Sequence, residues 1–136
     1  MFFKNSNNNT NNDLEKVAAL LIHTAKIDEN YSIKEEEIIK QTLINIGANN
    51  ENINQIIKNG KEIEQNSNQI LEFTKEVKSM NEEDKNYIVE ILWRIIYSNK
   101  EVDVYESNLM RRLAGLLYID NKTMGDIKEK IKREFS

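Results

Sequence analysis

The chain has 136 residues, a formal net charge of −4 and no cysteine. Its length fits one domain, and the lack of cysteine excludes disulfide bridges and thiolate metal sites. A mildly acidic chain is a poor candidate for binding a phosphate backbone. No apolar run approaches the ~20 residues that span a bilayer, and the start, MFFKNSNNNTNND, lacks the apolar segment of a signal peptide. We therefore expect a cytoplasmic protein that does not bind nucleic acid and contacts membranes at most peripherally.

The composition predicts an Asn-rich tail followed by one helical domain. Residues 1–12 are dominated by Asn, Ser and Thr, which bury little apolar surface, so we expect a disordered tail there and a folded domain at 13–136. The chain has no proline and only four glycines, and it is rich in Glu, Lys, Ile and Leu. That composition is typical of helices, and nothing reads as a strand. The predicted fold is all-α, a compact bundle of about seven helices.

Capping residues predict where the first two helices begin and end. Asp13 is the candidate N-cap of a helix at about 14–28. Ser32 and Glu35 form the capping-box pattern S-x-x-E, which opens a second helix. Gly47 follows the last apolar residue of that helix and is the expected C-terminal glycine.

The third and fourth helices are predicted from asparagine and serine caps ahead of apolar periodicity. Asn50 or Asn52 caps the third helix, and Gly60 is expected to weaken its middle or to mark a kink. Ser67 caps the fourth helix. Both segments carry apolar residues at steps of three and four, as an amphipathic helix requires.

Three further helices complete the predicted bundle. Asn81 begins a fifth helix that is apolar on too many sides for the surface, so we expect it to be the central buried element. Asp103 and Glu106 form a second capping-box pair that opens the sixth helix. Asp120 or Asn121 starts the last one.

One motif is written twice in the chain. When the sequence is shifted by 71 residues, Asp28 aligns with Asn99 and Glu35 aligns with Glu106. Each copy reads as a helix, a short loop and a capped helix. The sequence therefore predicts two pseudo-repeated helical hairpins that pack against each other, because each hairpin must bury its one apolar face.

The repeated oxygens favour either helix capping or a divalent cation. An EF-hand is excluded, because the glycine position of the first loop is Ile33 and its glutamate position is Ile39; the second loop has Val104 and Met110 there. A different oxygen site for a hard cation stays open. So does the alternative that the acids only satisfy helix-start N–H groups, each cap being worth about 1 kcal/mol.

With both motifs quoted, the chain resembles the TerB family, small helical proteins named for tellurite resistance. The first copy is AKIDENYSIKE at 25–35 and the second is IYSNKEVDVYE at 96–106, and the resemblance covers about residues 14–134. It implies a bundle of about seven helices, no established enzymatic activity and an association with stress responses. It also implies a role in divalent-metal binding for the motif positions, which are Asp28, Glu35, Asn99 and Glu106 here.

The two copies depart from the family pattern at three positions. The motif glycine is Glu29 in the first copy and Lys100 in the second, and the leading aspartate of the second copy is Asn99. Asparagine still offers a carbonyl oxygen to calcium or magnesium, but it brings no charge.

Other candidate chemistry is sparse. His23 is the only histidine and sits in the middle of a predicted helix, so we expect a surface or half-buried side chain rather than a catalytic base. Trp93 is expected in the core, and Arg111 and Arg112 on the outer face of the sixth helix. No set of nucleophile, base and acid is present in the sequence, so we expect no enzymatic activity.

The sequence favours a non-enzymatic TerB-like protein of stress or tellurite-resistance type. In this hypothesis it is a small helical scaffold or interaction module for an unidentified protein partner, regulated by a divalent cation such as calcium or magnesium. The alternative is a dedicated divalent-cation-binding protein that uses the motif acids Asp28 and Glu35.

Overall fold

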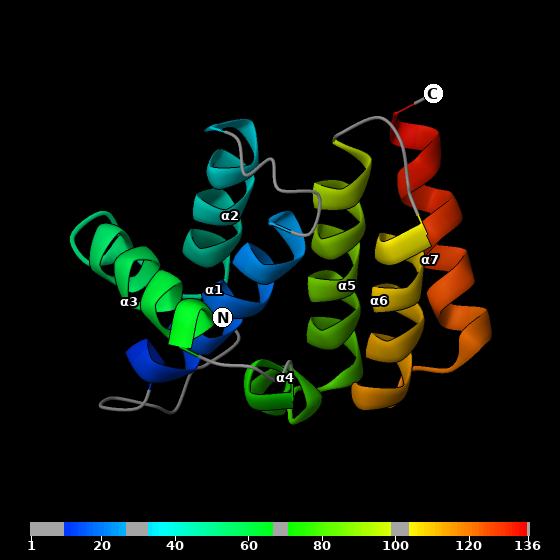
Figure 1. Ribbon diagram of the computed structural model, residues 1–136, viewed down its shortest axis with the longest axis horizontal. Helices are drawn as coiled ribbons and strands as arrows, with labels where there is room; N and C mark the ends of the chain where they lie inside the picture. Colours follow the sequence, from blue (N-terminus) through cyan, green and yellow to red (C-terminus); the bar gives the residue numbers. More distant parts are fainter. Residues whose placement is uncertain (1–9, 27–32, 67–70, 99–103, 136) are drawn as a thin grey trace.

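Seven helices make up the part of the chain that the computed structural model describes, residues 10–26, 33–66, 71–98 and 104–135 (Figure 1). They are α1 (Thr10–Ala25), α2 (Ile33–Asn45), α3 (Ile53–Asn66), α4 (Leu71–Lys78), α5 (Glu82–Tyr97), α6 (Val104–Leu116) and α7 (Asn121–Glu134). No strand occurs in these ranges. The all-α prediction is therefore confirmed.

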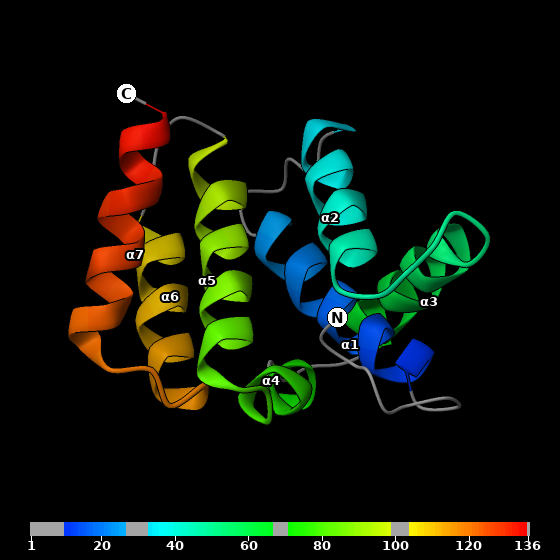
Figure 2. The ribbon, with the colours of Figure 1, turned by 180° about the vertical axis from the view of Figure 1, so that it is seen from behind.

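The bundle consists of two three-helix halves joined by α4. Helices α1, α2 and α3 form one half, and α5, α6 and α7 lie together on the other side of the molecule (Figures 1 and 2). Helices α2 and α6 have the same length, 13 residues, and start 71 residues apart. In both halves the first helix contacts the third. The predicted repeat of two hairpins thus extends to three helices per copy.

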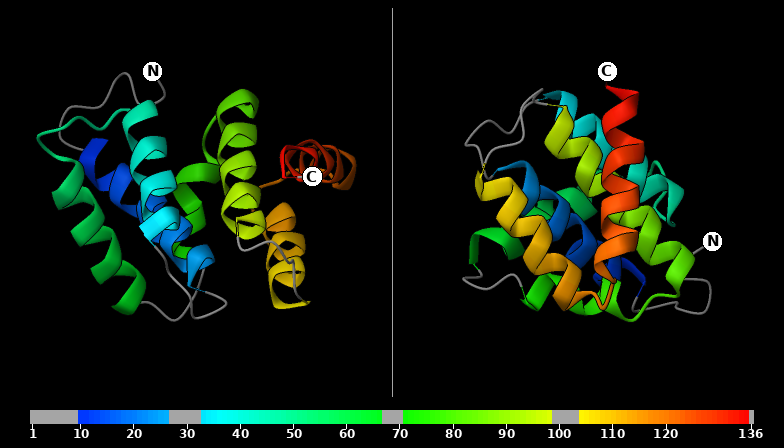
Figure 3. Two further views of the ribbon diagram at one scale, coloured as in Figure 1. Left: turned by 90° about the horizontal axis from the view of Figure 1, so that it is seen from above. Right: turned by 90° about the vertical axis from the view of Figure 1, so that its right-hand side faces the viewer.

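Helix α5 occupies the centre of the bundle, as its apolar sequence predicts. It contacts α1, α2 and α4 as well as α7. Seen from above, it lies between the first half and the other two helices of its own half, α6 and α7 (Figure 3). Ten of its 16 residues are buried, including Trp93. One continuous apolar cluster extends through α5 from α1 to α7. Burial of this helix therefore holds the two repeats together.

Most predicted helix starts are confirmed. The Asn81 side chain accepts a hydrogen bond from the Asp84 N–H at 2.8 Å, and Asp120 accepts one from the Thr123 N–H at 2.7 Å. These bonds satisfy amide groups that have no partner inside a helix. Between the two candidates named for α7, Asp120 is the cap.

The start of α1 differs from the prediction. Helix α1 begins at Thr10, so Asp13 is not its N-cap and lies within its first turn. An acid in a first turn is still favourable, because it faces the positive end of the helix dipole. Residues 1–9 of the predicted tail lie outside the described residues, whereas residues 10–12 belong to α1. The predicted cap Ser67 also lies outside them.

A reciprocal pair of asparagines precedes α3. The Asn49 side chain accepts hydrogen bonds from the N–H groups of Glu51 and Asn52, and the Asn52 side chain accepts one from the Asn49 N–H. Asn49 is therefore the cap ahead of α3, and Asn52, which directly precedes the helix, bonds back to the Asn49 N–H. The prediction that Asn50 or Asn52 is the cap was wrong, and the sequence analysis missed Asn49. Asn49 occupies the place in its repeat that Asp120 occupies in the second one.

Gly60 marks a close helix crossing rather than a kink. Helix α3 is continuous from Ile53 to Asn66, so the predicted kink is wrong. A Cβ atom at Gly60 would lie 2.8 Å from the Ala18 Cβ and 3.2 Å from the Glu15 backbone oxygen. Because glycine has no side chain, α1 and α3 can approach each other closely at this position.

Helices α2 and α6 end with the same backbone turn. The Ala48 N–H bonds to the Leu43 carbonyl at 2.9 Å, and the Ile119 N–H bonds to the Ala114 carbonyl at 2.9 Å. This six-to-one bond is typical of a Schellman motif, whose turning residue has a positive φ. That residue is Gly47 after α2, as predicted, and Tyr118 after α6.

Candidate functional site

The repeated motif places one buried glutamate at the start of a helix in each half. Glu35 is the third residue of α2 and Glu106 is the third residue of α6. Their exposed fractions are 0% and 2%. Both helices begin where the capping-box pattern predicts, so each glutamate occupies the position from which it can accept a bond from the cap residue's N–H.

Both glutamate carboxylates are removed from water. A carboxylate removed from water must be compensated by hydrogen bonds, a cation or a metal ion. Neither Glu35 nor Glu106 is without an interaction partner in the structure. The two halves thus bury a titratable oxygen pair at equivalent positions, and such an oxygen pair is the kind of ligand that hard divalent cations prefer.

The other two predicted site residues lie outside the described residues. These are Asp28 and Asn99, and the predicted caps Ser32 and Asp103 lie outside them as well. Within the described ranges, no three His, Cys, Asp or Glu side chains gather in a group that could hold a metal ion. The cation hypothesis therefore depends on Asp28 and Asn99 joining the two glutamates, which remains a prediction.

An exposed apolar residue stands beside the first motif. Ile33, the first residue of α2, has 83% of its surface exposed. It lies two positions before the buried Glu35. A single exposed apolar side chain is common on protein surfaces and adds little to the core.

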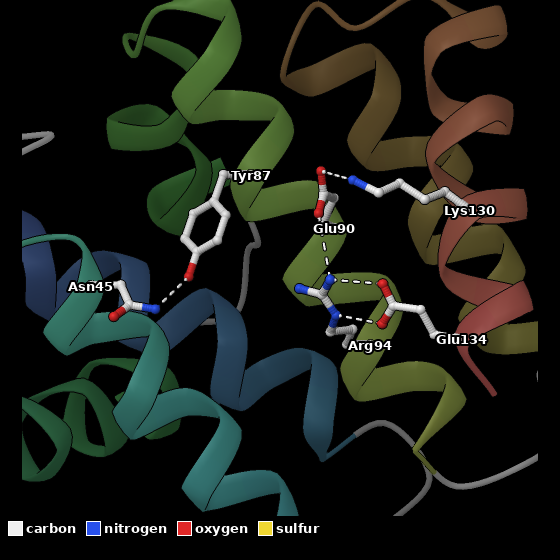
Figure 4. A network of polar contacts seen from close by, with 6 residues as sticks. All are labelled: Asn45, Tyr87, Glu90, Arg94, Lys130 and Glu134. Atoms are coloured by element: carbon white, nitrogen blue, oxygen red, sulfur yellow. Dashed lines mark hydrogen bonds and ion pairs between the residues drawn. The ribbon is translucent and has the colours of Figure 1, made fainter.

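A polar network joins α5 to α7 on one face (Figure 4). Arg94 donates two parallel hydrogen bonds of 2.9 Å to the Glu134 carboxylate, and Lys130 donates one of 3.1 Å to Glu90. The hydrogen bond to Glu134 raises the pKa of Arg94 above its ordinary value. Such bidentate pairs fix geometry as well as adding energy. They pin the last turn of α7 to the central helix.

The first half has a similar clamp between α1 and α3. Glu64 accepts a 2.8 Å hydrogen bond from Lys26, and its second oxygen lies 3.2 Å from His23 Nδ1. Burial raises the pKa of Glu64, but the hydrogen bonds from Lys26 and His23 lower it more, so the pKa lies below its ordinary value. His23 and Arg94 occupy equivalent positions in the repeat. Both clamp the first helix of a half to the third.

The sequence analysis placed His23 correctly but missed its partner. The side chain is half-buried, as expected, and its partner Glu64 lies 41 positions away. The one available signal was the repeat itself, because a 71-residue shift places His23 on Arg94. A basic residue at the same helical position in both copies indicates a shared contact.

The remaining residues singled out in the sequence lie where they were predicted. Trp93 is buried, and its indole N–H donates to the Met124 sulfur at 3.3 Å. The Lys128 ammonium of α7 lies 5.4 Å from the centre of the Trp93 ring. Arg111 and Arg112 are exposed on α6. None of the described helices is both long and apolar enough to cross a membrane.

Comparison with known proteins identifies the family. A family profile described as tellurite resistance protein TerB matches residues 14–129, which is most of the chain and includes both copies of the motif. Searches of the curated proteins and of the solved structures gave no match. The matched range runs from the first turns of α1 into the last turns of α7, so it covers both three-helix halves. The chain therefore belongs to the TerB family of tellurite resistance proteins.

Proposed function

We propose that this TerB-family chain is a non-enzymatic helical interaction module whose partner contact is regulated by a divalent cation. The cation, calcium or magnesium, binds at the repeated motif, and Glu35 and Glu106 are its ligands together with Asp28 and Asn99. The observation that carries the proposal is the matched burial of the two glutamates at equivalent helix starts. Buried carboxylates need hydrogen bonds, an ion pair or a metal ion, and their oxygens are ligands that a hard divalent cation prefers.

The exposed Ile33 links the motif to a partner. It lies at the helix start that the Glu35 ligand would fix, so a cation there would set how this apolar side chain is presented. Order imposed on a loop by a bound cation is a common way to control a protein contact. We therefore expect partner binding to use Ile33 and to depend on the cation.

A two-dimensional NMR titration tests the cation step. Calcium, then magnesium and manganese, is added to the ¹⁵N-labelled full chain and to a Glu35→Gln variant. Glutamine keeps the capping box, because it still accepts the bond from the cap N–H, but it removes the charge that a hard cation needs. We expect saturable shifts at 27–36 and 98–107 in the wild type, and a loss of the first set in the variant.

The matched control is Glu37→Gln, an exposed acid on the same helix. The NMR signals of this variant should shift with added cation as those of the wild type do. Saturable shifts without any cation-dependent binding of a partner protein would favour a dedicated cation-binding protein over a cation-regulated interaction module. No shift up to millimolar cation would contradict both proposals and leave the two glutamates as helix caps.

A further inference from the structure

A pocket of about 370 Å³ lies between α4 and the C-terminal end of α6. Its walls are Thr74, Lys75 and Lys78 from α4, Gly115 and Leu116 from α6, and Tyr118 just beyond that helix. The two helices contact each other, and α4 and the C-terminal end of α6 lie at the lower edge of the bundle in Figure 1. The volume is within the range of small-molecule sites, roughly 300–1,000 Å³. None of the motif residues lines this pocket.

The turn after α6 requires a positive φ, and the chain places a tyrosine, Tyr118, at that position. Its φ is 57°, and it is the one non-glycine residue with a positive φ in the described part of the chain. The equivalent turn of the first repeat uses Gly47, which adopts a positive φ without strain. Tyr118 is 71% exposed, so core packing does not explain the choice of a tyrosine here. Strain retained at a non-glycine residue points to a function for the side chain.

Both charged residues that line the pocket are lysines, although the whole chain carries a net charge of −4. Lys75 and Lys78 are one turn apart on α4, and the Lys78 ammonium lies 4.8 Å from the centre of the Tyr118 ring. The acid between them, Glu76, is turned away and pairs with Lys16 of α1 at 3.1 Å. On α6, the exposed Arg111 and Arg112 precede Gly115 by one turn.

We propose that this pocket binds a small organic anion that carries an aromatic or aliphatic group. Lys75 and Lys78 meet the anionic group, because their ammonium groups are the polar donors at the rim. Leu116 and the Tyr118 ring take up the apolar part. Gly115 leaves the floor open, since a Cβ atom there would meet nothing within 4 Å. The site is separate from the cation motif and does not rest on the function proposed above.

NMR titration with defined probes tests the proposal. The probes are 4-phenylbutyrate and phenyl phosphate, with 4-phenyl-1-butanol as the neutral analogue and acetate as the anion without an apolar part. We expect saturable shifts at Thr74, Gly115 and Leu116 with the two aromatic anions. Because an ion pair at the rim adds to apolar contact, the alcohol and acetate should each bind about tenfold more weakly or worse.

Three variants separate ligand binding from folding. Tyr118→Gly should keep or raise the melting temperature, because it relieves the positive φ, yet it should weaken the binding of both anions. Gly115→Leu should fill the pocket and abolish binding without loss of helicity. Lys75→Gln should weaken anion binding, whereas Lys58→Gln, an exposed lysine on α3, should not.

Two results would overturn the proposal. One is the absence of saturable shifts with both aromatic anions up to 10 mM, roughly the limit of specific weak binding. The other is equal binding of the anions and the alcohol, which would reduce the site to an apolar surface. A Glu35→Gln variant should bind the probes like the wild type. The test of the pocket is therefore independent of the cation titration.

Discussion

At the scale of single residues, the absence of a side chain at Gly60 sets how closely α1 and α3 pack. Helical periodicity shows Gly60 only as a weak helix former, because propensity is a local property. The crossing with Ala18 appears only when the two helices are docked. The sequence could therefore place the glycine on the right helix, but it could not distinguish a contact point from a kink.

Gly60→Ala tests whether Gly60 is a close contact point between α1 and α3. The added methyl group would lie 2.8 Å from the Ala18 Cβ and 3.2 Å from a backbone oxygen, so the helices must separate. Overpacking of this kind costs about 1–3 kcal/mol and outweighs the helix-propensity gain of about 1 kcal/mol. We expect a lower free energy of unfolding in urea. Gly125→Ala is the control, because nothing lies within 4 Å of its Cβ position, and it should stabilise the chain. Stabilisation by both changes would refute the close crossing.

Glu64 gives a second test at the residue scale, through pH. Its pKa in the folded chain lies below the ordinary value of 4.5, so the carboxylate stabilises the fold above pH 4.5, and this contribution is lost as the pH falls through the folded pKa. Glu64→Gln should lower the free energy of unfolding by about 1 kcal/mol at pH 6. The difference from the wild type should shrink towards pH 3.

Denaturant unfolding at several pH values measures this effect. The control is Glu62→Gln, an exposed acid on the same helix, which should show a small and pH-independent difference. A Glu64→Gln difference that stayed constant from pH 6 to pH 3 would mean that the clamp with Lys26 and His23 is not electrostatic.

At the scale of elements, local signals predicted the helices well. The starts of α5 and α7 follow from the side chains of Asn81 and Asp120, which accept hydrogen bonds from free N–H groups within three residues. Helices α2 and α6 begin where the capping-box pattern predicts. The contacts between helices were not predicted, because Arg94 and Glu134 lie 40 positions apart. Pairing over that distance depends on the register of two docked helices, which periodicity does not determine.

Arg94→Lys should loosen the end of α7. Lysine keeps the charge but cannot make the two parallel bonds to Glu134. Because Glu134 is partly exposed, we expect a loss below about 1 kcal/mol in global stability. We expect faster hydrogen exchange in the last turn of α7, measured by mass spectrometry. Lys122→Gln, which breaks an exposed pair within α7, should leave that turn unchanged. Equal exchange in the wild type and Arg94→Lys would contradict the clamp.

At the scale of the whole molecule, the fold is a duplicated three-helix unit with one shared core. The sequence showed the repeat only as two hairpins. The motif is strong around the loops, whereas the third helices of the two halves, α3 and α7, share few residue types. Their equivalence becomes visible from the matching caps Asn49 and Asp120 and from the matching clamps. Of the four predicted site residues, the structure describes Glu35 and Glu106, which are buried at equivalent positions, whereas Asp28 and Asn99 lie outside the described residues.

The most direct test of the cation proposal is the free energy of unfolding of the full chain in calcium and in EDTA. One continuous core predicts a single cooperative transition. If calcium binds the folded chain, the wild type should gain stability by mass action, about 2.7 kcal/mol at a calcium concentration of 100 times the dissociation constant. Glu35→Gln and Glu106→Gln should lose that gain while remaining folded. Identical stability of the wild type in calcium, magnesium and EDTA would contradict a cation at the repeated motif.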